Sequence, residues 1–228
     1  MNELVRQLQQ CILFRDIPVS VIEANVLPYG KLREVPKEQY LFGFQEKVDF
    51  FGVVISGMIH TQHIFSDGSY SITDVLEPSE VVAVDLMWTR TRISPYYAIS
   101  AAPSQVLTLP VTLVSQPGLL PEEYRQQIIR KMLTMISHDN MRKDYRLAVL
   151  AQKGLRERIM TYLTMQANKR HTAAFAIPFS REELASYLCV NRSALSHELS
   201  LMQQEGLIAF RKNEFTLLQW EQEEPIKK

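Results

Sequence analysis

Residues 179–207, FSREELASYLCVNRSALSHELSLMQQEGL, constrain the fold of this chain more than any other stretch. Ser180 is followed three residues later by Glu183, which is the spacing of a capping box at a helix start. Apolar residues recur at helical spacing, the pattern breaks at residues 189–191, and helical spacing then resumes at once. The stretch therefore predicts two short helices joined by a tight corner, an arrangement that holds one helix outward.

The second helix of this pair separates apolar from polar positions. Asn191 can cap its first turn, and Gly206 ends it. A buried side is predicted for Leu195, Leu199 and Met202, and an outward side for Arg192, Ser193, Ser196 and His197. Residues 207–210 and 215–218 then predict a two-stranded wing whose turn carries Arg211 and Lys212.

A helix held outward in this way fits the major groove of DNA, which is about 12 Å wide and admits one α-helix. Arg192 can make a bidentate contact to guanine, while Ser196 and His197 can reach bases or phosphates. Arg211 and Lys212 would add phosphate contacts from the wing. The alternative interpretation is an ordinary helical hairpin with a solvated polar face.

Charge and cysteine content narrow the class of protein. The 228 residues have no net charge, but residues 1–119 carry 8 Lys/Arg against 12 Asp/Glu, and residues 120–228 carry 17 against 13. The basic rear part is either a phosphate-facing surface or a solvated helix face. Two cysteines, Cys11 and Cys189, exclude a disulfide framework and a four-cysteine cluster and favour the cytoplasm. No apolar run approaches the roughly 18 residues of a membrane span, and the polar start MNELVRQLQQ is not typical of a secretory signal.

The N-terminal half of the chain contains two segments with different residue patterns. Residues 2–27 predict a partly amphipathic helix. Residues 31–114 then alternate short β-branched and aromatic runs with turn signals, and Asp67-Gly68 is a strong hairpin signal. These runs predict an antiparallel sandwich or barrel.

A long helix is predicted from Pro121 to about Leu150, because this segment holds no further Pro or Gly and begins with acidic residues. Its apolar residues recur at three- and four-residue steps. Such a helix either packs on a second copy of itself or is buried against its own domain, and we favour the dimer. Gly154 marks a break before another helix at residues 155–165.

Taken together, these features resemble the Crp/Fnr family of bacterial transcription regulators, and the most specific part is SREELASYLCVNRSALSHELSLMQQEGLI. The resemblance implies an α+β fold: an N-terminal antiparallel, jelly-roll-like β-roll sensor at residues 1–118, a dimerisation helix at 119–152, and a winged helix-turn-helix at 153–228. It places Ser180, Asn191 and the outward residues of the second helix at the DNA. The chain departs from the family pattern at Cys189, where Gly is common, and at His197, where many members have Arg, so base preference there can depend on pH.

The segment EVVAVDLMWTRTRISPYYAIS lies where cyclic-nucleotide members of the family hold a phosphate with Gly-Glu and Arg-Ser pairs. Here Ala83-Val84-Asp85 and Ser94-Pro95 stand at those places, and Pro95 lacks a backbone donor, so cyclic AMP is not the expected ligand. Aromatic and Met residues suit either an apolar pocket or an ordinary core. The candidate effector residues are Val84, Asp85, Met87, Trp88, Arg90, Arg92, Tyr96 and Tyr97, with Lys143 and Asp144 on the long helix by the same resemblance.

The sequence gives less support to a haem site, a redox-sensitive thiol or a metal-dependent enzyme. His60 and His63 are candidate haem ligands, but we favour histidines that face solvent or pack on a strand. Cys189 would make a ligand-free regulator sensitive to oxidation, but we favour a buried, inert thiol. A cupin-like, metal-dependent enzyme is the alternative from another class, and the sequence lacks its dense histidine pattern.

The sequence therefore predicts a dimeric, sequence-specific DNA-binding transcription regulator and not an enzyme. We expect it to need no cofactor or metal ion. Its expected partners are double-stranded DNA with a near-palindromic operator, a second copy of the chain, RNA polymerase if it activates, and a small-molecule effector or other signal at the β-roll. No membrane partner is expected.

Overall fold

The computed structural model describes residues 3–66, 68 and 70–220 and divides into two compact units, Met1–Asn140 and Met141–Lys228. We call Met1–Asn140 the sensor unit; it contains most of the strands. We call Met141–Lys228 the reader unit; it contains the two helices that the sequence predicts on either side of a tight corner. Helix α5 (Glu122–Leu150) spans the division between them.

The N-terminal segment is not the continuous helix that its sequence predicts. Pro18 lacks an amide hydrogen and restricts the residue before it, so a helix cannot run through this point. Turns separate the pieces, which still bury the apolar residues of the segment against the sensor core. The pieces are α1 (Glu3–Leu8), α2 (Val19–Val21), the π-helical turn η1 (Ile22–Val26) and the 3₁₀ turn η2 (Leu27–Tyr29).

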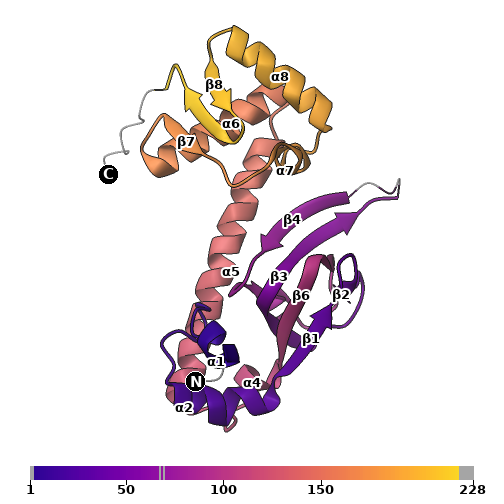
Figure 1. Ribbon diagram of the computed structural model, residues 1–228, viewed down its shortest axis with the longest axis vertical. Coiled ribbons are helices and arrows are strands. Elements are labelled where there is room, and N and C mark those ends of the chain that lie inside the picture. Colours follow the sequence, from indigo (N-terminus) through magenta and orange to yellow (C-terminus); the bar gives the residue numbers. More distant parts are fainter. Residues whose placement is uncertain (1–2, 67, 69, 221–228) are drawn as a thin grey trace. The chain divides into compact units, whose positions relative to one another are not determined.

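The sensor unit is built on one antiparallel sheet, which confirms the predicted α+β class with an N-terminal antiparallel β domain. Its strands are β1 (Lys31–Val35), β2 (Tyr40–Phe42), β3 (Phe50–Ile64), β4 (Tyr70–Leu76), β5 (Val81–Val82) and β6 (Tyr97–Pro110). They run in the order β1-β6-β3-β4, with β2 on β6 and β5 on β3, and the long strands lie side by side in Figure 1. The pair Ile64 and Tyr70 closes the predicted β3–β4 hairpin, although Asp67 of its turn lies outside the described residues.

Helix α5 begins after Pro121 with Glu122 and Glu123 in its first turn, as predicted. Ile128 and Met132 are fully buried and pack in the sensor core with the N-terminal segment and the short helices α3 (Val84–Met87) and α4 (Thr112–Ser115). Farther along, four large apolar side chains of α5 stay exposed, namely Leu133, Met141, Tyr145 and Leu147.

The reader unit combines helices with a small sheet. Its elements are α6 (Leu155–Arg170), β7 (Ala174–Ala176), α7 (Arg181–Tyr187), α8 (Arg192–Gln204), β8 (Ile208–Arg211) and β9 (Glu214–Leu217). The predicted two-stranded wing is present, and β7 adds a third strand to it in the order β7-β9-β8. Among the described residues, the structure contains no helix that is both long and apolar enough to span a bilayer.

Candidate nucleic-acid interface

The capping box at the start of α7 forms as predicted. The backbone N–H of Glu183 donates to Ser180 Oγ at 3.3 Å, and the Ser180 N–H donates to Glu183 Oε2 at 2.7 Å. This reciprocal pair satisfies two amides that a helix start leaves without partners. The Ser180 side chain thus has a structural role before any contact with DNA.

The corner between the two helices turns at Cys189. The Cys189 and Val190 amides donate back to the Ser186 and Ala185 carbonyls at 3.1 and 3.0 Å, which closes the end of α7. Cys189 itself has φ 56°, in the left-handed region that favours glycine. Its thiol is exposed, so the prediction of a buried thiol is wrong: the left-handed turn directs this side chain outward instead of into the core.

Asn191 starts α8, since its Oδ1 accepts the Ala194 N–H at 2.7 Å. The predicted inner face is confirmed, with Leu195, Leu199 and Met202 each 0% exposed. The predicted outer face is also found: Arg192, Ser193 and His197 are exposed, and Ser196 is half-buried. The sequence thus places a short polar face with one guanidinium outward on α8.

A further arginine, which the sequence analysis missed, connects α7 to the wing. Arg181, the first residue of α7, donates to the Lys212 carbonyl at 3.0 Å, and its guanidinium carbon lies 4.9 Å from the centroid of the Phe210 ring. Burial, and then the nearby charge of Arg192, lower the pKa of Arg181. One sequence feature could have singled out Arg181: it is a positive charge in the first turn of a helix, where the helix dipole disfavours positive charge.

The reader unit therefore gathers cations from three elements. Arg181 belongs to α7 and Arg192 to α8, while Arg211 and Lys212 are exposed at the tip of the wing. Like charges near one another raise the free energy of the isolated protein, and an anion placed against them offsets that repulsion. A chain of phosphates is the polyanion that best matches such a surface.

The effector residues predicted in the sensor unit are brought together only in part. Val84 and Met87 are core residues, 5% and 4% exposed, and Tyr96 donates its hydroxyl to Asp85 at 2.7 Å. Burial and the Asp85 charge raise the pKa of Tyr96 above its ordinary value. Val84 and Met87 thus pack in the sensor core.

The other predicted effector residues face elsewhere. Arg92 pairs with Asp49 at 2.9 Å, and Tyr97 packs 5.4 Å from Tyr40, centroid to centroid. Trp88 and Arg90 are exposed, as are Lys143 and Asp144, which belong to the reader unit's part of α5.

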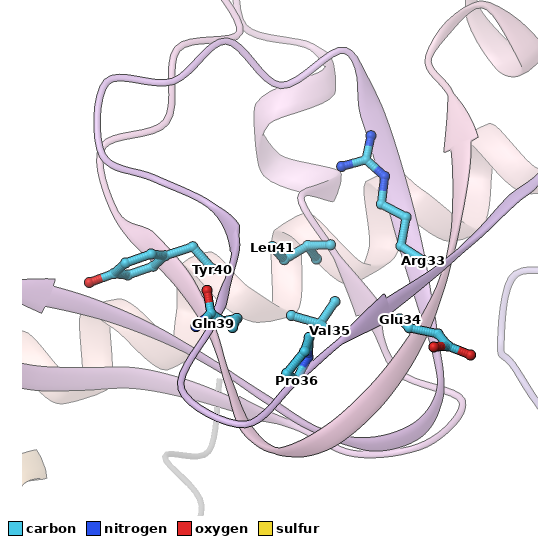
Figure 2. A pocket seen from close by; sticks show the side chains of 7 residues that line it. All are labelled: Arg33, Glu34, Val35, Pro36, Gln39, Tyr40 and Leu41. Carbon is cyan, nitrogen blue, oxygen red and sulfur yellow. The ribbon is translucent and has the colours of Figure 1, made fainter.

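A shallow pocket in the sensor unit borders the segment of the predicted effector residues, because Tyr97 packs on Tyr40, one of the pocket residues. It has a volume of about 330 Å³ and is formed by β1, β2 and their connection. Figure 2 shows Arg33 and Glu34 from β1 and Tyr40 from β2 around an apolar floor of Val35 and Leu41. None of the predicted effector residues lines it.

The two histidines of β3 have different surroundings. His60 stands opposite Val75 and Ile99 in the sheet, and His63 is exposed. Within the described ranges, no three His, Cys, Asp or Glu side chains are grouped closely enough to hold a metal ion.

Comparisons with known proteins agree with this geometry. A Crp-like helix-turn-helix domain matches residues 157–222, which include α7, α8 and the wing. The transcriptional activator protein FnrA of Stutzerimonas stutzeri is 27% identical over 192 residues, covering 82% of this chain and 76% of that protein.

Two solved structures share the fold. CLP of Xanthomonas campestris, described as a c-di-GMP-responsive global regulator, has a TM-score of 0.64 at 17% identity, covering 88% of this chain and 99% of that one. FixK2 of Bradyrhizobium japonicum has a TM-score of 0.58 at 19% identity, covering 82% and 92%. The helix-turn-helix of this chain matches a Crp-like domain, and with the antiparallel sensor sheet and the long helix the chain is similar to transcription regulators of the Crp/Fnr family.

Proposed function

We propose that the protein binds DNA as a dimer and that α8 reads base edges in the major groove. The observation that carries this proposal is a cationic surface formed by the exposed Arg192 of a capped helix, the exposed wing residues Arg211 and Lys212, and the half-buried Arg181, which donates to the Lys212 carbonyl. Arg192 is the base-reading residue, because its fork of donors matches the acceptors of guanine.

The remaining residues of this face have supporting roles. Ser193, Ser196 and His197 reach bases or phosphates from α8, and Arg211 and Lys212 bind phosphates from the wing. Ser180 Oγ and Asn191 Oδ1 already accept cap hydrogen bonds, which leaves the Ser180 hydroxyl hydrogen and the Asn191 amide hydrogens as donors to phosphate. Arg181 braces the wing and adds positive charge.

The proposed dimer forms along α5. Large apolar side chains on a helix surface favour a partner helix, and Leu133, Met141, Tyr145 and Leu147 are 52–64% exposed. A two-fold dimer presents two copies of α8 to half-sites about one helical turn, roughly 34 Å, apart, so the operator is a near-palindrome. RNA polymerase is a further partner if the protein activates transcription.

We further propose that the signal sensed by this chain is a small molecule or another input, but not cyclic AMP. Near the position of the family's Gly-Glu pair, Val84 is a buried core residue and Asp85 accepts the Tyr96 hydroxyl. A cupin-like enzyme has no support among the relatives, which are transcription regulators.

Selection from a random duplex library tests the proposal. The purified protein is incubated with the library at two salt concentrations, and the bound DNA is sequenced. Enrichment of a near-palindrome, with binding that weakens steeply as salt rises, is the expected result. Bound DNA without sequence preference, both alone and with cell extract added to supply an effector, would contradict it.

A further inference from the structure

The carbonyl end of α7 is held by arginines from two other helices. Arg146 of α5 donates from Nε to the Tyr187 carbonyl at 3.2 Å and from a terminal nitrogen to the Ser186 carbonyl at 3.4 Å. Its guanidinium carbon also lies 5.0 Å from the centroid of the Tyr187 ring. Arg158 of α6 donates to the next carbonyl, that of Leu188, at 3.3 Å.

The chemistry of this contact fits a helix end. The last carbonyls of a helix lack intrahelical partners and carry the negative end of its dipole. A guanidinium supplies a fixed fork of donors and a permanent positive charge, so it can bind two successive carbonyls at once. Because the corner at residues 189–191 follows directly, holding these carbonyls also fixes where Asn191 starts α8.

A third arginine, Arg156 of α6, binds two carboxylates in the second half and at the C-cap of α8. Arg156 of α6 donates from Nε to Glu198 at 2.7 Å, and from both terminal nitrogens to the Glu205 carboxylate at 2.7 and 2.9 Å. Glu205 and Glu198 together raise the pKa of Arg156 above its ordinary value. Arg146, Arg156 and Arg158, which we call the arginine clamp, thus contact the carbonyl end of α7 and the second half of α8 with its C-cap.

The last turns of α5 are part of the same compact unit. The reader unit begins at Met141, inside the helix and well before its end at Leu150. Val149 is 0% exposed and packs in the reader core with Leu195 and Leu199 of α8. The end of α5 is therefore joined to the recognition helix by core packing as well as by Arg146.

We propose that Arg146 is a positioning residue for DNA recognition, which couples the end of α5 to the carbonyl end of α7 and so sets the direction of α8. Arg156 and Arg158 complete the coupling from α6. The inference rests on the proposed reading role of α8. It assigns to Arg146 an effect on sequence preference without any contact with DNA.

Three variants test the proposal: Arg146→Met, Arg146→Lys and Arg170→Met. Methionine keeps much of the side-chain stem, while lysine keeps the charge but lacks the fork. Arg170 is the matched control, because its guanidinium binds the Ala176 carbonyl and packs 5.5 Å from the Phe175 ring centroid, away from the corner. Affinity for the library-selected duplex and for a scrambled duplex is measured at one salt concentration, below the melting transition of every variant.

The expected result is about tenfold weaker binding of the selected duplex by Arg146→Met, with little change on the scrambled duplex. Arg146→Lys recovers only part of this loss, and Arg170→Met keeps the wild-type ratio of the two affinities. The proposal would be overturned if Arg146→Met kept the wild-type ratio of affinities for the selected and scrambled duplexes. It would also be overturned if Arg170→Met lowered that ratio as much as Arg146→Met does.

Amide hydrogen exchange of the free full-length protein tests the coupling without DNA. In Arg146→Met, amides at residues 189–195 are expected to exchange faster, while those of the sensor sheet keep the wild-type rate. Unchanged exchange at the corner would overturn the coupling. If wild-type protein shows no sequence preference but the corner loosens in Arg146→Met, the reading role of α8 fails and the coupling stands.

Discussion

At the scale of single residues, Cys189 shows how the corner depends on one backbone conformation. Its φ of 56° costs a residue with a Cβ roughly 1–2 kcal/mol, and glycine avoids that cost at the expense of about 1 kcal/mol of chain entropy. The exposed thiol contributes little packing in return. The tight corner is thus maintained by the helices on either side of it rather than by its central residue.

Replacing Cys189 by glycine is expected to raise the free energy of unfolding by up to about 1 kcal/mol, because relief of the steric penalty exceeds the added chain entropy. Cys189→Ala keeps a Cβ and serves as the control, with stability close to that of the wild type. Urea denaturation of all three proteins measures the effect. Loss of stability in Cys189→Gly would mean that the thiol makes contacts that matter.

At the scale of elements, the bounds and the buried face of α8 follow from short-range sequence patterns. The caps at Ser180 and Asn191 and the apolar spacing of Leu195, Leu199 and Met202 involve neighbours within four residues, so they could be predicted. Arg181 could not, because its role depends on the wing folding back onto α7 from about thirty residues away. The strand β7 was not predicted for a similar reason: its three residues form a strand because they pair with β9, about forty residues later in the chain.

Two substitutions at Asn191 separate its role as a cap from its nearness to DNA. Asn191→Ala removes the acceptor for the Ala194 amide and is expected to cost about 1 kcal/mol of stability. Asn191→Asp keeps the acceptor, so stability stays near the wild-type value, but its negative charge repels phosphates and weakens DNA binding. Thermal melts and binding titrations at low salt measure both effects. Full DNA affinity in Asn191→Asp would place the helix start away from the phosphates.

At the scale of the whole molecule, the long helix has two kinds of apolar residue. Ile128 and Met132 are buried in the sensor core, whereas Leu133, Met141, Tyr145 and Leu147 remain exposed. The breaker-free sequence predicted the length of this helix, but its apolar spacing alone could not divide the residues between the core and a partner. That division depends on which turns of α5 the N-terminal segment covers, and the sequence had predicted that segment as one unbroken helix.

Placing a charge on the exposed stripe is expected to weaken the proposed dimer. Leu133→Glu puts a carboxylate where a partner helix would bury it, and the dissociation constant of the dimer should rise at least tenfold. Gln39→Glu adds the same charge at an exposed position between β1 and β2, off helix α5, and serves as the control. Sedimentation velocity over a range of concentrations gives the association state. Equal effects of the two substitutions would argue against a dimer along this stripe.

The most direct test of the reading role of α8 is the affinity of wild-type and Arg192→Ala protein for the library-selected duplex and for a scrambled duplex, measured at equal salt. Arg192→Ala is expected to lose about 1–3 kcal/mol of binding free energy on the selected duplex and much less on the scrambled one, since a guanine contact carries sequence information and a phosphate contact does not. Equal losses on both duplexes would contradict it and reduce Arg192 to a phosphate contact.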